Sequence, residues 1–391
     1  MIFTPKEEIS SRTEKLRVLM EKASLDGAFF NYKIDYFYLS GTMQDAFLYV
    51  PLEEEPKLFV RRDMRRARRE SPLSDLISIR SLETVKDHIG NPRRVGFQLD
   101  VLPYNFVMRF KRLLGDAELV DISPIMNDLR KIKSPFEVSL MEKAAAIAKK
   151  VYEKIPEVLR EGMMEIELGG ILEAYAKTLG HEGLLRVRSQ TFEAYSWHIL
   201  SGKVGSIVSQ MNSPMGGLGM SPAFPVGASR KKIRRGEPIM IDFGICYHGY
   251  QVDETRMFAI DHMPELFAKA YEACREIHYR VLDKSMEGVT CSELFQHSVD
   301  LAHKLGYGDS YLGYAPHKVN FLAHGIGIEL SEPPFIATKM DYPLEEGMTF
   351  AIEPKMVFPR QGACGIENTV LIEKDRYRVL TDIDERIIVV D

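Results

Sequence analysis

The chain has 391 residues, of which 45% are hydrophobic and 27% are charged, and its formal net charge is -5. This length predicts two ordinary domains, and the charge gives no electrostatic basis for binding nucleic acid. Nothing at the N-terminus resembles a secretory signal, and no apolar run approaches the roughly 20 residues of a membrane-spanning helix. We therefore expect a cytoplasmic protein that does not bind membranes, with its four cysteines reduced in the core.

The first third of the chain alternates helical and strand-like patterns. Ser11 and Glu14 have the spacing of a capping box, and apolar residues follow at helical spacing until Gly27. Short apolar runs predict strands at residues 28–30, 57–60, 94–97 and 119–122. We expect a small α/β domain over residues 1–134, ending in the polar, proline-containing segment 129–135.

Six arginines lie between residues 61 and 69. An anionic partner or a subunit contact would use such a cluster, but a solvated helix face is the more common reason for one. We expect these arginines to be exposed and assign them no function.

Residues 135–391 carry a pattern that repeats loosely. Helical patterns at about 136–160 and 165–179 precede an acidic hairpin, and helical patterns at about 263–284 and 291–305 precede a second one. Two similar halves that each contribute acids predict an α+β domain with a site between the halves.

The first hairpin carries two aspartates in an otherwise apolar ribbon. If the chain turns at residues 248–249, Asp242 lies opposite Thr255, and Asp253 lies opposite Gly244. Both carboxylates then face one side, because positions two apart keep the same side of the pleat. Two acids there are unfavourable unless a cation neutralises them, so the hairpin predicts a metal site.

The second half supplies the matching residues. Residues 348–356 and 364–372 read as apolar strands that carry Glu353 and Glu367. Between the two hairpins, His324 is followed by glycines at residues 325 and 327, which let a ligand approach the backbone closely. Four carboxylates predict two divalent ions, since one would leave net negative charge. The oxygen-rich set suits Mn²⁺, Co²⁺, Fe²⁺ or Zn²⁺, and two such ions about 3.5–4 Å apart activate water for hydrolysis.

The same five residues, with the motifs around them, resemble the pita-bread metallopeptidases, which include methionine aminopeptidase, aminopeptidase P, prolidase and creatinase. The matching motifs are IDFG, DETR, HGIG, SEPP, GMTFAIEP and GIEN. The N-terminal domain and the LRKIKS segment are similar to the N-terminal region of prolidase, aminopeptidase P and creatinase, which methionine aminopeptidases lack. The resemblance therefore covers nearly the whole chain and implies the Xaa-Pro branch.

The resemblance also implies an architecture and a site. It implies a pita-bread catalytic domain over residues 135–391, built from two pseudo-symmetric αβ halves, and a homodimer. Glu353 would also handle the proton of the metal-bound water. The implied ligands of a dinuclear centre are Asp242, Asp253, His324, Glu353 and Glu367.

Three positions depart from the family pattern. The family usually has histidines, which hydrogen-bond the substrate or the tetrahedral intermediate, where this chain has Pro225 and Ser331, and many members have an arginine where it has Gly365. Losing such donors costs about 3 kcal/mol of transition-state stabilisation. The sequence therefore identifies no substrate-binding residues.

One segment and two histidines can compensate. Residues 202–225 are longer than the usual pattern and rich in Gly, Met and Ser, so they either cover the site or form a surface insertion. His198 and His317 either face the site or are structural, and His248, at the hairpin turn, is expected to be exposed.

The leading hypothesis is an Xaa-Pro peptidase of the aminopeptidase P or prolidase type, which cleaves an amide with a metal-bridging hydroxide. Two alternatives stay open: a creatinase-like hydrolase of a small amide or amidine, and a binding member of the fold without turnover. The intact ligand set argues against the last.

Overall fold

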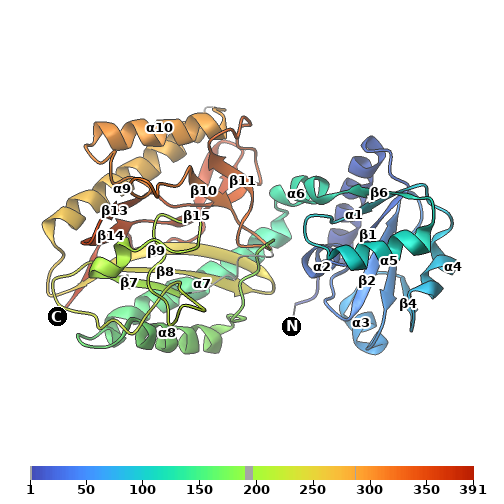
Figure 1. The fold of residues 1–391 in the computed structure, drawn as a ribbon, viewed down its shortest axis with the longest axis horizontal. Helices are drawn as coiled ribbons and strands as arrows, with labels where there is room; N and C mark the ends of the chain where they lie inside the picture. The colour runs from blue at the N-terminus through green and yellow to red at the C-terminus, as the bar shows by residue number, and fades with distance from the viewer. Residues whose placement is uncertain (1, 190–196, 287) are drawn as a thin grey trace. The chain divides into compact units, whose positions relative to one another are not determined.

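The computed structural model describes residues 2–189, 197–286 and 288–391 (Figure 1). The chain divides into two compact units, Met1–Arg130 and Lys131–Asp391. The division lies within the polar segment in which we predicted the seam, while the boundary at residue 134 itself stays a prediction. In the described part of the chain, no helix has both the length and the apolar character needed to cross a bilayer.

The N-terminal unit is built on a six-stranded mixed sheet with strand order β4-β3-β2-β1-β5-β6. The four predicted strands are confirmed, and β2 and β4 were missed. The strands are β1 (Gly27–Phe30), β2 (Ala46–Pro51), β3 (Lys57–Val60), β4 (Asp75–Ser78), β5 (Arg94–Phe97) and β6 (Glu118–Asp121). The helices are α1 (Lys6–Lys22), α2 (Lys33–Ser40), α3 (Met64–Glu70), α4 (Lys86–Ile89), α5 (Tyr104–Leu114) and α6 (Ser123–Lys131).

The predicted start of the first helix is wrong. Helix α1 begins at Lys6, and Pro5, with an extended backbone, occupies the N-cap position. Ser11 is an exposed residue inside the helix. Acidic residues in the first turn, Glu7 and Glu8, favour this earlier start because they complement the positive end of the helix dipole.

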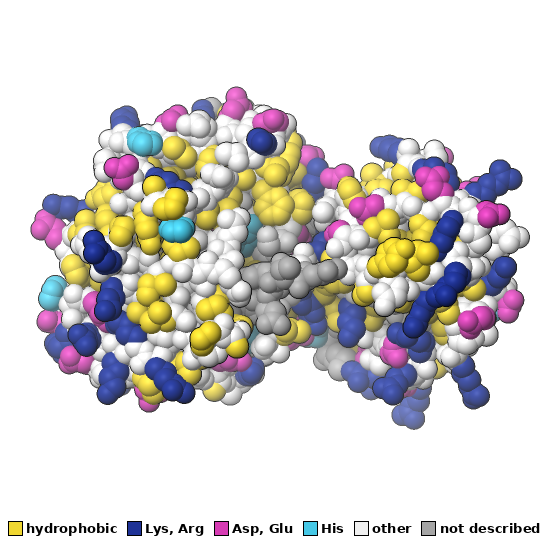
Figure 2. Space-filling view, viewed as in Figure 1, with side chains coloured by type: hydrophobic (Ala, Val, Ile, Leu, Met, Phe, Trp, Pro, Cys, Tyr) yellow, Lys and Arg dark blue, Asp and Glu magenta, His cyan; other side chains and the backbone are white. Residues whose placement is uncertain are grey.

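The arginine cluster lies on and beside α3. Each of its six arginines is exposed, and the helix is capped by Asp63, which accepts a hydrogen bond from the backbone N–H of Arg66 at 2.9 Å. Figure 2 shows lysine and arginine side chains standing out over the surface of the N-terminal unit among acidic ones. The expected exposure of the arginines is confirmed, and the interpretation as a solvated helix face stays a prediction.

Within residues 131–189, 197–286 and 288–391, the C-terminal unit contains two helix pairs and three sheets. Helices α7 and α8 pack on the sheet β17-β9-β8-β7, while α9 packs on β13 and β14, and α10 on β10 and β11 (Figure 1). The helices are α7 (Pro135–Val158), α8 (Glu165–Leu179), α9 (Glu265–Ser285) and α10 (Cys291–Lys304). The first sheet contains β7 (Trp197–Ser201), β8 (Ile239–Tyr247), β9 (Tyr250–Ile260) and β17 (Ile388–Val390).

The other two sheets belong to the second half of the unit. One has the strand order β11-β10-β12-β15-β16, and the other pairs β13 with β14. The strands are β10 (Phe321–Gly325), β11 (Glu332–Ala337), β12 (Thr349–Ile352), β13 (Lys355–Phe358), β14 (Gly362–Gly365), β15 (Asn368–Glu373) and β16 (Arg376–Val379). Each half therefore combines a helix pair with strands that carry acids, as the repeat predicted.

The register predicted for the first hairpin is confirmed. Asp242 pairs with Thr255, and Asp253 pairs with Gly244. The two-residue turn has positive φ at both positions, 49° at His248 and 84° at Gly249, which is the geometry that matches the twist of the flanking strands. Both aspartates therefore lie on one side of the ribbon.

The second hairpin differs from its prediction. Each predicted strand is broken at its glutamate, so that β12 and β15 pair in the large sheet and β13 and β14 pair in the small one. At the breaks the backbone bonds elsewhere: the N–H of Glu353 donates to Leu322, and Glu367 exchanges hydrogen bonds with Thr255 of the first hairpin. Pro354, which has no N–H to donate, follows the first break.

Candidate metal centre

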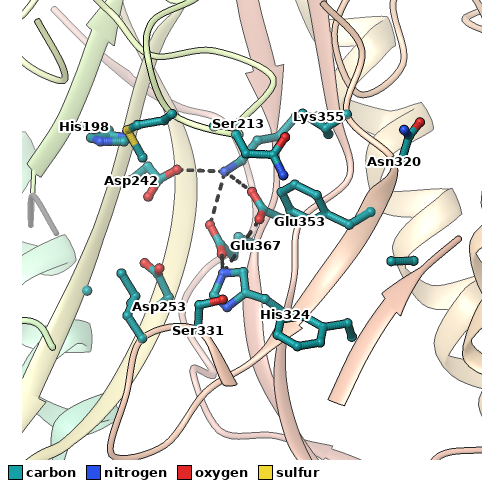
Figure 3. Close-up of a pocket in the computed structure, with 18 of the residues that line it drawn as sticks. His198, Ser213, Asp242, Asp253, Asn320, His324, Ser331, Glu353, Lys355 and Glu367 are labelled. Carbon is teal, nitrogen blue, oxygen red and sulfur yellow. Dashed lines mark hydrogen bonds and ion pairs between the residues drawn. The ribbon is translucent and has the colours of Figure 1, made fainter. Parts of the chain in front are cut away.

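The five predicted residues converge on one cavity in the C-terminal unit. Its volume is about 780 Å³. Asp242 comes from β8, Asp253 from β9 and His324 from β10, while Glu353 and Glu367 come from the two strand breaks. Figure 3 shows the five side chains around one space, with dashed lines that join Lys355 to Asp242, Glu353 and Glu367 and join His324 to the two glutamates.

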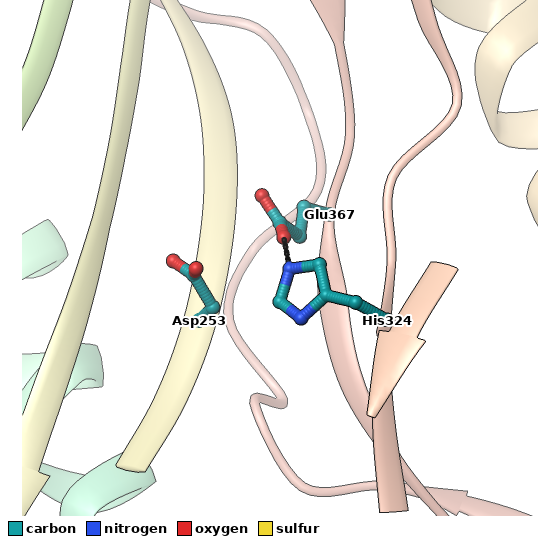
Figure 4. A group of neighbouring side chains, drawn as sticks. All are labelled: Asp253, His324 and Glu367. Atoms are coloured by element: carbon teal, nitrogen blue, oxygen red, sulfur yellow. Dashed lines mark ion pairs between the residues drawn. The ribbon is translucent and has the colours of Figure 1, made fainter. Parts of the chain in front are cut away.

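Three of the five are placed to hold one metal ion together. Asp253, His324 and Glu367 each offer one ligand atom, and these atoms lie within 4.8 Å of one another (Figure 4). The imidazole Nε2 of His324 is 3.9 Å from Glu367 Oε1. A spacing of this size fits one divalent ion between two carboxylates and an imidazole, since metal–ligand distances are about 2.0–2.2 Å.

Hydrogen bonds from neighbouring residues orient this group. The Thr255 hydroxyl donates to Glu367 Oε2 at 2.8 Å, and the Thr369 hydroxyl accepts from the backbone N–H of Asp253 at 2.9 Å. Arg256 is buried and donates to the backbone carbonyl of Glu367 at 2.7 Å. Such outer contacts fix the direction in which ligands point, and they explain why the DETR segment accompanies the aspartate.

Lys355, for which no role was predicted, lies among these acids. Its Nζ atom is 2.8 Å from Asp242 Oδ2, 2.7 Å from Glu353 Oε2 and 3.3 Å from Glu367 Oε2. The side chain is 2% exposed. The sequence did contain a signal for this role. Lys355 lies in an apolar strand two residues after a candidate ligand, and an ammonium buried there needs acids as partners.

Burial and mutual repulsion perturb the acids. Burial, together with the charges of Glu367 and Asp242, raises the pKa of Asp253 well above its usual value. Burial raises the pKa of Glu367 to about 8, with Glu353 and Asp242 adding to the shift and Lys355 opposing it. Burial also acts to raise the pKa of Asp242, but Lys355 outweighs it and the pKa is lowered.

The same acids stabilise the charged form of Lys355. Burial opposes it, but Asp242, Glu353 and Glu367 raise the pKa of Lys355 well above its ordinary value. One ammonium still leaves the four carboxylates with excess negative charge. The donor set and this excess fit a divalent ion at Asp253, His324 and Glu367.

The histidines that were considered as replacements for the missing family histidines differ in where they lie relative to the cavity. His198 is buried, pairs with Asp242 across β7 and β8, and lines the cavity, and burial lowers its pKa. His317 is exposed and is not among the residues that line the cavity. His248 is half-buried rather than exposed, with its ring 4.7 Å from that of Tyr247.

The segment 202–225 contributes directly to the cavity wall. It begins with the short helix η2 (Gly202–Ser206), and its residues Gln210, Met211, Asn212 and Ser213 line the cavity beside the acids. Ser331 also lines the cavity, whereas Pro225 does not. Of the two interpretations of this segment, the structure favours the one in which it shapes the pocket.

The fold and the site together define a metal-dependent hydrolase with a two-unit architecture. The sequence model of metallopeptidase family M24 matches residues 139–374, and that of the creatinase/prolidase N-terminal domain matches residues 12–132. The chain belongs to metallopeptidase family M24. This membership confirms the predicted resemblance, fold class and enzyme class, and divalent metal ions are the cofactors that it implies.

Individual relatives cover both units. The chain is 28% identical to the Xaa-Pro dipeptidase of Pyrococcus furiosus, over 97% of this chain and 100% of the relative. It is 27% identical to the Xaa-Pro dipeptidase of Pyrococcus horikoshii, over 97% and 99%. The crystal structure of the prolidase from Pyrococcus furiosus aligns with a TM-score of 0.77 at 27% identity, covering 94% of this chain and 99% of that one.

Proposed function

We propose that the chain is an Xaa-Pro peptidase of the prolidase type, which hydrolyses the amide bond before proline in short peptides. The observation that carries the proposal is the convergence of Asp253, His324 and Glu367, with ligand atoms within 4.8 Å, on the cavity that also holds Asp242 and Glu353. The relatives that span the full chain and are named Xaa-Pro dipeptidases support the choice of substrate.

The proposed roles follow from position. Asp253, His324 and Glu367 would hold a divalent ion, which when bound would lower the pKa of a water and polarise the amide carbonyl. Glu353 lines the cavity and takes the proton of the attacking water, then passes it to the leaving nitrogen. Asp242 and Glu353 complete the predicted ligand set, with Mn²⁺, Co²⁺, Zn²⁺ or Fe²⁺ as the ions that their oxygens suit.

Polar side chains from the inserted segment replace the missing family histidines in this proposal. Gln210, Asn212 and Ser213 line the same cavity as the acids and carry amide and hydroxyl donors. They are placed to hydrogen-bond the peptide where Pro225 and Ser331 offer less. A homodimer and a cytoplasmic location belong to the proposal as well, and the four buried, unpaired cysteines fit a reducing compartment.

A second candidate is a hydrolase of small amides or amidines. It is favoured by one observation, that Pro225 is absent from the cavity wall and Ser331 replaces a histidine there. The positions that differ from the family pattern are therefore those expected to bind the ends of a peptide.

One substrate panel tests both candidates. Purified protein loaded with Mn²⁺, Co²⁺ or Zn²⁺ is assayed on Xaa-Pro dipeptides, on longer peptides with proline second, and on creatine and simple amides. We expect release of proline from dipeptides, lost in Asp253→Ala and retained in Asp300→Ala, a control on the exposed face of α10. Metal-loaded protein that hydrolyses only the small amides would overturn the peptidase proposal in favour of the second candidate.

A further inference from the structure

Lys355 occupies the position of a cation in the acidic centre. Its ammonium has three donors, and three carboxylate oxygens, from Asp242, Glu353 and Glu367, lie within 3.3 Å of it (Figure 3). A buried ammonium is stable only with such partners, and the partners are neutralised in return. Lys355 therefore performs, for these oxygens, the electrostatic task of a metal ion.

The oxygens that contact Lys355 are those that a second ion would need. Asp242 is not part of the group formed by Asp253, His324 and Glu367. Glu353 is divided between the two cations, since its Oε2 contacts Lys355 at 2.7 Å while its Oε1 lies 3.7 Å from His324 Nε2. A divalent ion binds a carboxylate oxygen at roughly 2.1 Å. With Nζ only 2.8 Å from Asp242 Oδ2, an ion on that oxygen would lie within about 4.9 Å of the ammonium. The ammonium and a second ion would therefore compete for the same carboxylate oxygens.

The opposite strand is shaped to admit the lysine side chain. Lys355 pairs with Gly365 across β13 and β14. A Cβ atom at residue 365 would lie 2.4 Å from Lys355 Cγ and 2.9 Å from the carbonyl oxygen of Pro354. Because both contacts are shorter than real Cβ atoms tolerate, glycine is the residue that leaves the path of Lys355 open. The two positions act as a matched pair.

We propose that Lys355 is a built-in cation that takes the place of one of the two predicted metal ions. The chain then binds one divalent ion, held by Asp253, His324 and Glu367, while Asp242 and Glu353 are held by the ammonium. The inference rests on the proposed function only in taking this cluster as the metal centre. It replaces the two-ion prediction made from the carboxylate count, which did not include the lysine.

Metal stoichiometry tests the inference directly. Metal-free protein is titrated with Mn²⁺, and bound metal is measured by equilibrium dialysis and by electron paramagnetic resonance. We expect one Mn²⁺ per chain with the spectrum of an isolated ion in the unmodified protein. Lys355→Met is expected to bind two, with the broadened spectrum of a coupled pair. Lys318→Met removes another lysine that lines the cavity, outside the contacts of the acids, and is expected to bind one.

Two outcomes overturn the inference: two Mn²⁺ per chain in the unmodified protein, or one in a folded Lys355→Met. If Lys355→Met does not fold, the stoichiometry and spectrum of the unmodified protein decide. The peptide assay separates this inference from the proposed function. One ion without turnover refutes the function alone, and two ions with turnover refute the inference alone.

Discussion

The two acidic hairpins of the C-terminal unit differ in how they present their carboxylates. The first pairs without interruption from Ile239 to Tyr247, and its aspartates point to the centre because of the alternation of the strand. The second is broken at both glutamates, whose backbones bond to other elements. A continuous strand places a ligand by its period alone. A broken strand places it by tertiary contacts.

The largest expected effect is on activity, and it tests whether Glu353 of the broken hairpin accepts the proton of the attacking water. Glu353→Gln keeps the shape of the side chain but cannot accept the proton, so we expect kcat/KM on an Xaa-Pro dipeptide to fall by about 10²–10⁴-fold. The fall should lie in kcat, with bound metal retained, which steady-state kinetics and metal analysis would measure. Unchanged turnover in Glu353→Gln would refute this role.

The next largest expected effect is a pH dependence of stability, which comes from one acid of each hairpin. In the metal-free protein, burial raises the pKa of Glu367 from 4.5 to about 8, and burial also raises that of Asp253. At these two sites the folded chain therefore binds more protons than the unfolded chain over this range. Their contribution to the free energy of unfolding should fall as pH rises from about 4.5 to about 8.

Urea denaturation at several pH values measures this change, with metal-loaded protein as the control. The bound ion stabilises the ionised carboxylates, so the decline should be smaller when metal is present. If the stability of metal-free protein relative to metal-loaded protein did not fall over the same range, the assignment of excess negative charge to the centre would be contradicted.

The smallest effect compares the same substitution in both hairpins. Gly365→Ala places a Cβ atom against Lys355 and a backbone carbonyl, and we expect a loss of about 1–3 kcal/mol of stability. In Gly244→Ala the atom within 3.0 Å belongs to the movable end of the Leu185 side chain, so the loss should be smaller. Thermal or urea denaturation of both variants gives the two values. Equal losses would mean that the path of Lys355 is not tightly constrained.

Local rules accounted for much of the fold. The register of the first hairpin followed from its two-residue turn, and helix α8 (Glu165–Leu179) matches the predicted range, because period and turn chemistry are short-range properties. The start of α1 at Lys6 and the strand breaks at Glu353 and Glu367 were not predicted. These depend on competition between local patterns and contacts made elsewhere in the chain.

The sequence by itself determined the kind of site, because four acids and a histidine in apolar strands are unstable without a cation, whatever the details of packing. Tertiary structure decided that an ammonium lies among these acids. Lys355 is one charged residue in an apolar run until folding brings Asp242 and Glu367 within 3.3 Å of its ammonium. Partners separated by 113 and 12 positions in the chain leave no periodic signal, since the interaction is formed only by the folded backbone.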